Sequence, residues 1–163
     1  MTLSAATAGP ERIQLPVFYG TDFVFLDSVD KPGRDQPIIR FIYINREAAE
    51  KARKGQPLPL GTKIIMAEQV GGTNANGQPQ RDKHGRFVAT KQISRILVSE
   101  KQAGWGEVYP EEDRVGDWEF AVFSADGKLM PDVDYDACRR CHRQAVTYDY
   151  TFSVFPNLSA LKR

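Results

Sequence analysis

The sequence predicts an α+β fold that is mainly strand with a few short helices. Residues 38–44 and 117–124 are rich in β-branched and aromatic side chains, as strands are. Ten prolines interrupt the chain, and its periodicity excludes a four-helix bundle. With 163 residues the chain is long enough for one domain with a hydrophobic core. We expect a flexible segment over residues 1–14 and a single domain over residues 15–163.

The first half of the chain supplies two predicted strands and one helix. Residues 15–26 are aromatic-rich and form either a short helix or an extended packing arm. After the strand over residues 38–44, Asn45 is placed to cap a helix over residues 46–54. Only alanines give this helix an apolar stripe, so we expect it to cover the sheet from outside. A second strand is predicted over residues 62–69.

The second half continues with strands and ends in a helix. Residues 87–88 and 92–99 are predicted as strand, followed by the strand over residues 117–124 and a turn at residues 125–127. The chain then reaches a predicted helix near its C-terminus. Beyond that helix, residues 148–155 supply aromatic surface.

Two cysteines and a histidine in the C-terminal helix form the strongest chemical signature of the sequence. Cys138 and Cys141 are spaced i, i+3 and His142 follows directly, which is the attachment pattern of a c-type haem. On a helix the three side chains fall within a little over one turn, and Asp134 or Asp136 can cap that helix. We expect one covalently attached haem c per chain, with His142 as the iron ligand.

Two other interpretations of the cysteine pair compete with haem attachment. A zinc site normally needs four ligands, and His84 is the only further cysteine or histidine in the sequence. A thioredoxin-like redox pair would follow the first strand of a βαβ pattern, which the sequence lacks. Covalent haem attachment is the interpretation that the motif favours.

Several residues on the predicted strands are candidates for the haem surroundings. Arg40 shares a strand face with apolar residues, so it is either a strand-end charge that reaches water or a pocket residue. Met66 is either a soft axial ligand or core filler. Glu68 lies on the same face as Met66 and could act as a base, although an exposed glutamate is the commoner case. His84 is either solvated in a turn or a sixth iron ligand.

Charge and hydropathy bear on partners and compartment. Basic and acidic residues nearly balance, at 22 and 21, so we expect no nucleic-acid or membrane partner. No apolar run is long enough to span a bilayer. Residues 1–10 lack the basic and apolar regions of a signal peptide. Because haem c is attached beyond the bacterial inner membrane, we expect a periplasmic protein whose sequence is that of a processed or recombinant form.

Motifs in a specific order surround the haem attachment site. They are the strand with Arg40, the helix over residues 46–54, Gly61-Thr62, Gly104-Trp105-Gly106 with Tyr109-Pro110, residues 116–120 and 126–128, the haem motif, Asp149 and Phe152-Ser153. Over residues 15–155 this order and spacing resemble the cytochrome P-460 family, which includes the β-sheet type of cytochrome c-prime.

The resemblance implies an antiparallel sheet, a five-coordinate haem held by His142, a homodimer, and chemistry on hydroxylamine or nitric oxide. It also implies that Arg40 lies near the haem, where it could donate to a propionate or a bound ligand. In hydroxylamine-oxidising members a lysine five residues after the glycine of the Gly-Thr pair cross-links to the porphyrin. Here that position is Met66, and Lys63 should face the other way.

We therefore expect a cytochrome with an open axial site, walled by Phe41, Met66 and Phe152, that binds small nitrogen-oxide ligands such as nitric oxide. One alternative is an enzyme that oxidises hydroxylamine or nitric oxide, for which Arg40 and Glu68 are the catalytic candidates. The other is a six-coordinate electron-transfer cytochrome with Met66 or His84 as the second ligand, which would serve a redox partner protein.

Overall fold

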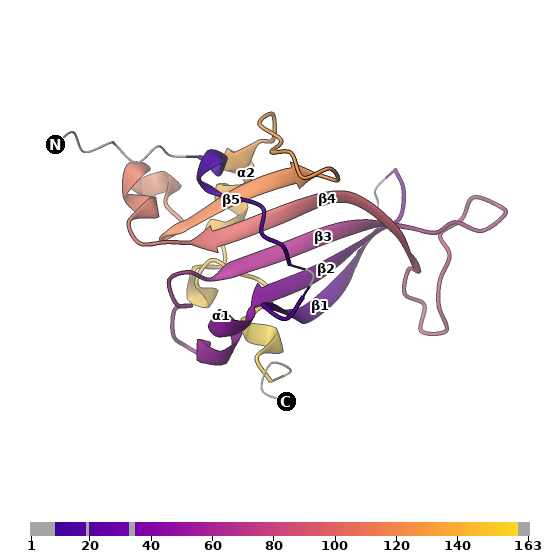
Figure 1. Ribbon diagram of the computed structural model, residues 1–163, viewed down its shortest axis with the longest axis horizontal. Helices are drawn as coiled ribbons and strands as arrows, with labels where there is room; N and C mark the ends of the chain where they lie inside the picture. Colours follow the sequence, from indigo (N-terminus) through magenta and orange to yellow (C-terminus); the bar gives the residue numbers. More distant parts are fainter. Residues whose placement is uncertain (1–8, 19, 33–34, 160–163) are drawn as a thin grey trace.

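A five-stranded antiparallel sheet forms the centre of the computed structural model, which describes residues 9–18, 20–32 and 35–159 (Figure 1). The strands lie in the order β1-β2-β3-β4-β5, and every neighbouring pair is antiparallel. They are β1 (Phe23–Lys31), β2 (Ile38–Asn45), β3 (Lys63–Gly71), β4 (Ala89–Lys101) and β5 (Trp118–Ser124). Because consecutive strands are spatial neighbours, the sheet is a simple meander.

Helices are few and short. In the described ranges the α-helices are α1 (Arg46–Lys51) and α2 (Tyr135–Arg143). Single 3₁₀ turns occur at η1 (Pro10–Arg12), η2 (Trp105–Val108), η3 (Glu111–Asp113), η4 (Val146–Tyr148) and η5 (Phe155–Asn157). The predicted fold class, mainly antiparallel strand with a few helices and the cysteine-bearing helix near the C-terminus, is confirmed.

Some element boundaries differ from the prediction. In the segment predicted as a short helix or an extended arm, Leu15 and Phe18 are not helical and pack on one face of the sheet, as an arm would. Residues 23–26 are instead the start of β1, where a bulge between Phe25 and Asp27 interrupts the alternation of side chains. Helix α1 ends at Lys51, since Ala52 already has extended backbone angles. Asn45 occupies the N-cap position of α1 as predicted, but its side chain makes no capping hydrogen bond. Its amide donates to the Gly61 carbonyl at 3.1 Å and accepts from the Lys63 N–H at 2.8 Å, so it ties β2 to the start of β3.

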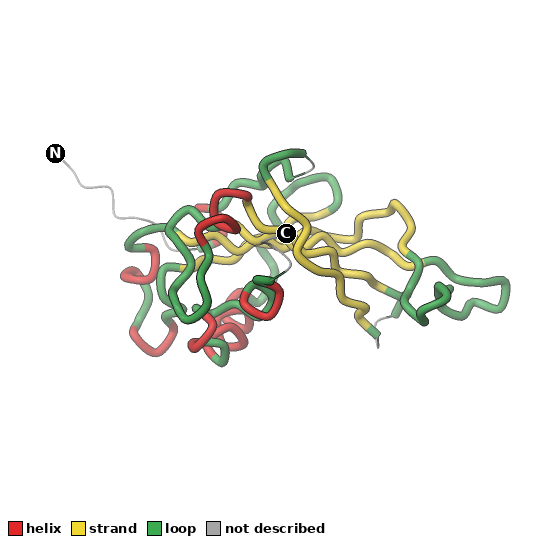
Figure 2. The backbone as a smooth tube through the Cα atoms, turned by 90° about the horizontal axis from the view of Figure 1, so that it is seen from below, coloured by secondary structure: helices red, strands yellow, loops and turns green. Residues whose placement is uncertain are grey.

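The two faces of the sheet carry separate apolar clusters. On one face, Ile42, Ile44 and Ile64 belong to the cluster that Tyr135 of α2 joins. On the other face, Ile65 and Ala67 pack with residues of the N-terminal segment. Figure 1 shows that segment crossing one face while α2 and the C-terminal segment lie behind the other. The loops between β3 and β4 extend away from this body (Figure 2).

The N-terminal segment is only partly described. Residues 1–8, which we expect to be flexible, lie outside the described residues. Farther along, Ile13 is 3 % exposed and packs on the sheet, and the Gly9 N–H donates to Glu119 Oε2 at 3.2 Å. The boundary at residue 15 and the single-domain organisation stay predictions.

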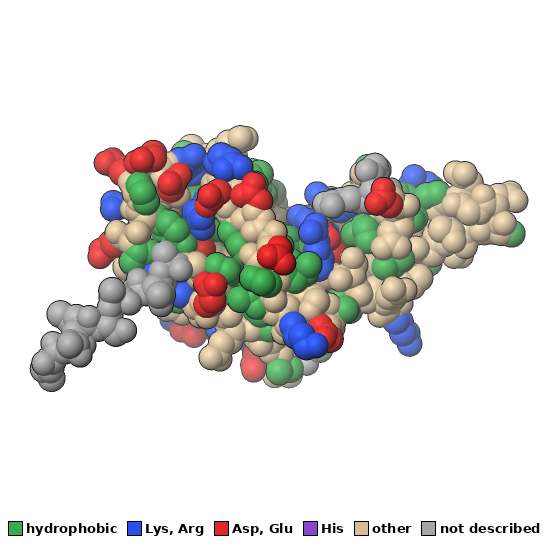
Figure 3. Space-filling model, turned by 90° about the horizontal axis from the view of Figure 1, so that it is seen from above, with side chains coloured by type: hydrophobic (Ala, Val, Ile, Leu, Met, Phe, Trp, Pro, Cys, Tyr) green, Lys and Arg blue, Asp and Glu red, His purple; other side chains and the backbone are tan. Residues whose placement is uncertain are grey.

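The surface carries charges of both signs. Acidic and basic side chains lie close together on the face in Figure 3. Within the described ranges, none of the helices has the length and apolar character needed to cross a membrane.

Candidate functional site

A cavity of about 410 Å³ lies between the sheet and the segment that contains α2. Four neighbouring strands form one wall, with Val29, Lys31, Arg40, Ile42, Ile64, Met66, Leu97 and Ser99. The chain from α2 onward forms the other, with Cys141, His142, Thr151, Phe152 and Ser153. Its volume falls within the range of about 300 to 1,000 Å³ that is typical of ligand and cofactor pockets.

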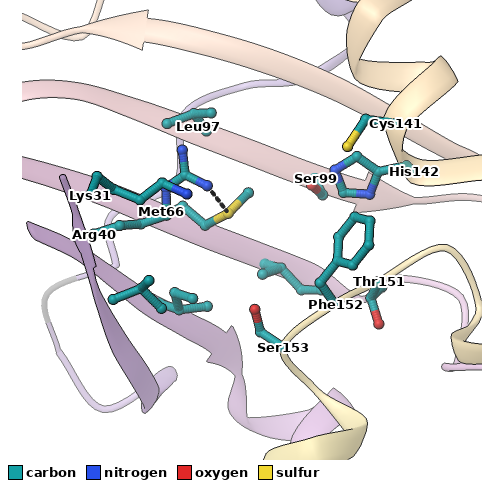
Figure 4. A pocket seen from close by; sticks show the side chains of 13 residues that line it. Lys31, Arg40, Met66, Leu97, Ser99, Cys141, His142, Thr151, Phe152 and Ser153 are labelled. Atoms are coloured by element: carbon teal, nitrogen blue, oxygen red, sulfur yellow. Dashed lines mark hydrogen bonds between the residues drawn. The ribbon is translucent and has the colours of Figure 1, made fainter. Parts of the chain in front are cut away.

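The cavity is mainly apolar and carries positive charge at one end. Lys31 and Arg40 are the charged side chains among its described lining residues. Figure 4 shows Arg40 and Met66 on one side of the cavity and His142 with Cys141 on the other. A ligand in this space would therefore meet an imidazole on one side and a guanidinium beside a thioether on the other.

The ring of His142 is fixed by a hydrogen bond and by two aromatic rings. Its Nδ1 lies 2.6 Å from the Tyr150 carbonyl oxygen. Because a carbonyl can only accept, Nδ1 carries the proton and Nε2 keeps its lone pair. Phe120 and Phe152 flank the ring, with centroids at 4.4 and 5.2 Å. Burial lowers the pKa of His142 more than the bond to Tyr150 raises it, so the imidazole favours the neutral form that binds metals.

Helix α2 presents the cysteines beside this histidine. Asp134 caps the helix as predicted, accepting from the Ala137 N–H at 2.9 Å, and this bond lowers the pKa of Asp134. Cys138 and Cys141 are free thiols. Cys138 is half-buried against the core, where burial raises the pKa of its thiol, and Cys141 is exposed at the cavity. A c-type haem needs two thiols that can form thioether bonds and one neutral imidazole that can ligate iron, and these residues beside an apolar cavity fit that group.

Arg40, Glu68 and Arg95 form a row across three strands. Arg40 faces Glu68 and Glu68 faces Arg95 in the strand register. Arg40 Nη2 lies 2.5 Å from Glu68 Oε1, and Arg95 Nε lies 2.7 Å from Oε2. Both carboxylate oxygens are therefore engaged by guanidinium groups.

This row corrects the expectation that Glu68 is exposed, and it disfavours a role for Glu68 as a base. Glu68 is 2 % exposed. Burial acts to raise the pKa of Glu68, but the hydrogen bonds and charges of Arg95 and Arg40 outweigh it, so the pKa lies below its usual value. A carboxylate that is paired with two arginines and ionises easily is a poor proton acceptor. The physical reason for the burial is the strand register, which supplies a cation on each side.

The structure brings together most, but not all, of the predicted site residues. Arg40, Met66, Cys141, His142 and Phe152 line the cavity, and Cys138 lies one helical turn before Cys141.

Two predicted candidates lie elsewhere. Phe41 lies on the opposite face of β2, where its strand partner is Ala67 of the second apolar cluster, so it does not wall the cavity. His84 is exposed in the turns between β3 and β4 and is not part of the described lining. In the part of the chain that the structure describes, no cluster of three or more histidine, cysteine, aspartate or glutamate side chains could hold a metal ion.

Other cavity residues were missed by sequence analysis. Val29 and Lys31 belong to the half of β1 beyond its bulge, where polar residues obscure the strand pattern. Leu97 and Ser99 lie two residues apart on the predicted strand, so they share one face of it. Their pairing opposite Met66 and Ile64 would have placed them at the cavity. The carbonyl acceptor of Tyr150 leaves no trace in the sequence, because any residue can supply it.

Comparison with known proteins identifies the family of the chain. The family model described as Cytochrome P460 matches residues 19–153, a range that includes all the described lining residues of the cavity. Comparison with curated proteins found no match.

Proposed function

The chain belongs to the cytochrome P460 family and is a haem cytochrome, and from this premise we propose that it is a mono-haem c-type cytochrome whose open axial site binds small nitrogen-oxide ligands such as nitric oxide. Cys138 and Cys141 would hold the haem covalently, and His142 would ligate its iron through Nε2. The bound haem would supply an iron atom with one axial position taken by the protein and one available to a small ligand.

The observation that carries the proposal is the contact between Arg40 and Met66 across the cavity from His142. Arg40 Nη1 lies 3.8 Å from the Met66 sulfur, whereas its Nε and Nη2 donate to Glu68. The thioether of Met66 thus already has a cationic neighbour, which disfavours its use as a second iron ligand. Nη1 is the part of the guanidinium that Glu68 leaves for the cavity, where it could donate to the oxygen of a bound ligand.

The aliphatic part of the strand wall favours neutral ligands. Ile42, Ile64 and Leu97 line the same side of the cavity and offer no hydrogen-bonding side chain. Such a surface disfavours water relative to a small apolar molecule, because it cannot replace the hydrogen bonds that water loses. The Arg40 guanidinium beside these aliphatic side chains suits a ligand that is neutral and carries an oxygen acceptor.

The alternative functions have less support. Oxidation of hydroxylamine requires a proton acceptor, and Glu68 is held by Arg40 and Arg95. The position of the family's cross-linking lysine is occupied by Met66. A six-coordinate electron-transfer site would need Met66 to leave Arg40, or His84 to leave its exposed turn. No observation favours either alternative over ligand binding.

Compartment and partners are part of the same proposal. A covalent c-type haem supports a periplasmic location, because attachment takes place outside the bacterial inner membrane. The family resemblance supports a homodimer. Exchange of electrons with a redox partner protein would restore the iron to the state that binds the ligand.

An anaerobic nitric oxide titration of the reduced holoprotein tests this function. We expect saturable binding of one nitric oxide per haem. In parallel, hydroxylamine is supplied with an artificial electron acceptor, and we expect no turnover. Steady turnover would instead support the oxidoreductase, and absence of nitric oxide binding would overturn the proposal.

A further inference from the structure

An unusual turn follows helix α2 and carries the acceptor for His142. Asp149 and Tyr150 have φ values of 50° and 59°, and they are the non-glycine residues with positive φ in the ranges that the structure describes. Left-handed backbone is disfavoured for residues with a side chain, and more for tyrosine than for aspartate. Two such residues in succession persist only where surrounding contacts hold them.

A largely buried ion pair between Lys101 and Asp149 stabilises this turn. Asp149 Oδ2 accepts from Lys101 Nζ at 2.8 Å and from the Leu58 N–H at 2.8 Å. Lys101 Nζ also donates to the Leu58 carbonyl at 2.9 Å. The Lys101 and Asp149 side chains are 9 % and 12 % exposed. The pair therefore fixes the turn to the end of β4 and to the loop that precedes β3.

Tyr150 is also fixed by a backbone hydrogen bond and by a contact of its ring. Its N–H donates to the Ala145 carbonyl at 2.9 Å, just beyond α2. Its ring packs on Gly116, where an added Cβ would lie 3.0 Å from Tyr150 Cε2. With the backbone fixed in this way, the Tyr150 carbonyl points at His142 Nδ1 at 2.6 Å.

We propose that Lys101 and Asp149 are positioning residues that set the hydrogen bond between His142 Nδ1 and the Tyr150 carbonyl, and thereby the strength of His142 as an iron ligand. Neither residue is among the described lining of the cavity, so they act through the turn. A hydrogen bond to the non-ligating nitrogen orients the ring and raises the basicity of the ligating one. The inference rests on the proposed function, because it requires His142 to ligate haem iron.

Three variants of the holoprotein test this role. Lys101→Met removes the ammonium, Asp149→Ala removes the carboxylate, and Asp149→Asn keeps an oxygen that can accept from Leu58 in a residue that tolerates left-handed backbone. Lys51→Met is the matched control, since it removes the lysine of an exposed ion pair with Glu47. The readouts are the iron–histidine stretching band in resonance Raman spectra of the reduced protein and the reduction potential.

We expect Lys101→Met and Asp149→Ala to shift the band to lower frequency and to favour the reduced state at least threefold, which corresponds to about 28 mV for one electron. Asp149→Asn should shift both readouts less, and Lys51→Met should shift neither. A smaller shift of the band and potential in Asp149→Asn than in Asp149→Ala distinguishes a positioning role from a general loss of stability. If Lys101→Met and Asp149→Ala do not fold, the band and potential of Asp149→Asn test the positioning role.

Variants that fold and keep the wild-type band and potential would overturn the positioning role. The wild-type protein tests the proposed function in the same series. A wild type that does not bind nitric oxide would overturn the proposed function, while the band and potential of the variants would still report on Lys101 and Asp149. A wild type without an iron–histidine band would overturn the ligation by His142 and, with it, the positioning role.

Discussion

The guanidinium of Arg40 is clamped by the carboxylate of Glu68, which faces it on the neighbouring strand with Arg40 Nη2 2.5 Å from Glu68 Oε1. The clamp occupies Nε and Nη2 and leaves Nη1 toward Met66 in the cavity. Arg95 binds the other oxygen of the same carboxylate. Glu68 thus holds Arg40 in the cavity wall, and Arg95 helps to balance the charge of Glu68. Different nitrogens of the Arg40 guanidinium therefore serve two purposes: Nε and Nη2 position the side chain, and Nη1 can act on a ligand.

Arg40→Leu should weaken nitric oxide binding. A hydrogen bond from a charged donor contributes about 1.5 to 3 kcal/mol, so we expect roughly a tenfold to hundredfold higher dissociation constant. Anaerobic titration measures it. Arg95→Leu is the matched control, since it also removes one partner of Glu68 but no described lining residue. Equal affinities in the wild type and Arg40→Leu would remove Arg40 from the ligand site.

Glu68→Gln should destabilise the fold at neutral pH. The variant leaves two partly buried guanidinium groups without their anion, and we expect a loss of about 2 kcal/mol in the free energy of unfolding. Urea titrations at pH 7 measure it. Glu47→Gln, in an exposed pair with Lys51, should leave the unfolding curve nearly unchanged.

The destabilisation by Glu68→Gln should also depend on pH. The pKa of Glu68 in the folded protein lies below its usual value of 4.5. The ionised group therefore stabilises the fold fully above pH 4.5, and this stabilisation is lost as pH falls through the lowered pKa. Wild type and variant should thus converge in acid. A constant difference down to the acid-unfolding limit would contradict the ionic origin of the effect.

Met66→Leu should leave the absorption spectrum unchanged. The substitution nearly conserves volume, and we expect it to cost less than about 1.5 kcal/mol of stability. If Met66 were an axial ligand, its loss would convert a low-spin spectrum to a high-spin one. Spectra of both proteins, oxidised and reduced, distinguish the two cases.

Each cysteine of α2 should contribute one covalent bond to the haem. We expect the intact mass of the holoprotein to exceed that of the chain by one haem, and the haem to resist extraction into acidified acetone. Cys138→Ala and Cys141→Ala should each retain a single thioether bond and yield less holoprotein. Complete extraction of haem from the wild type would contradict covalent attachment.

The parts of the fold that sequence analysis predicted are those with regular local patterns. Strand β2 and strand β5 are dense in β-branched and aromatic residues, and the face alternation predicted for β3 is the one observed, with Ile64 and Met66 opposite Ile65 and Ala67. Strand β1 was missed because its bulge and its polar residues disturb the period of two.

The site was predictable only where its chemistry is local in sequence. The haem motif places Cys138, Cys141 and His142 by spacing alone. The burial of Glu68 depends on its register between Arg40 and Arg95, and register is a long-range property. Phe41 was placed at the cavity because its residue type suits a porphyrin wall, whereas the pleat of β2 turns it to the opposite face.

The absorption spectrum of the reduced holoprotein, before and after nitric oxide is added, tests the central claim most directly. An open site without a cross-link predicts a Soret band at the ordinary c-type position, with high-spin features, that shifts when nitric oxide is added. A strongly red-shifted reduced band would indicate a modified porphyrin and contradict the argument from Met66. A low-spin spectrum that nitric oxide leaves unchanged would contradict an open axial site.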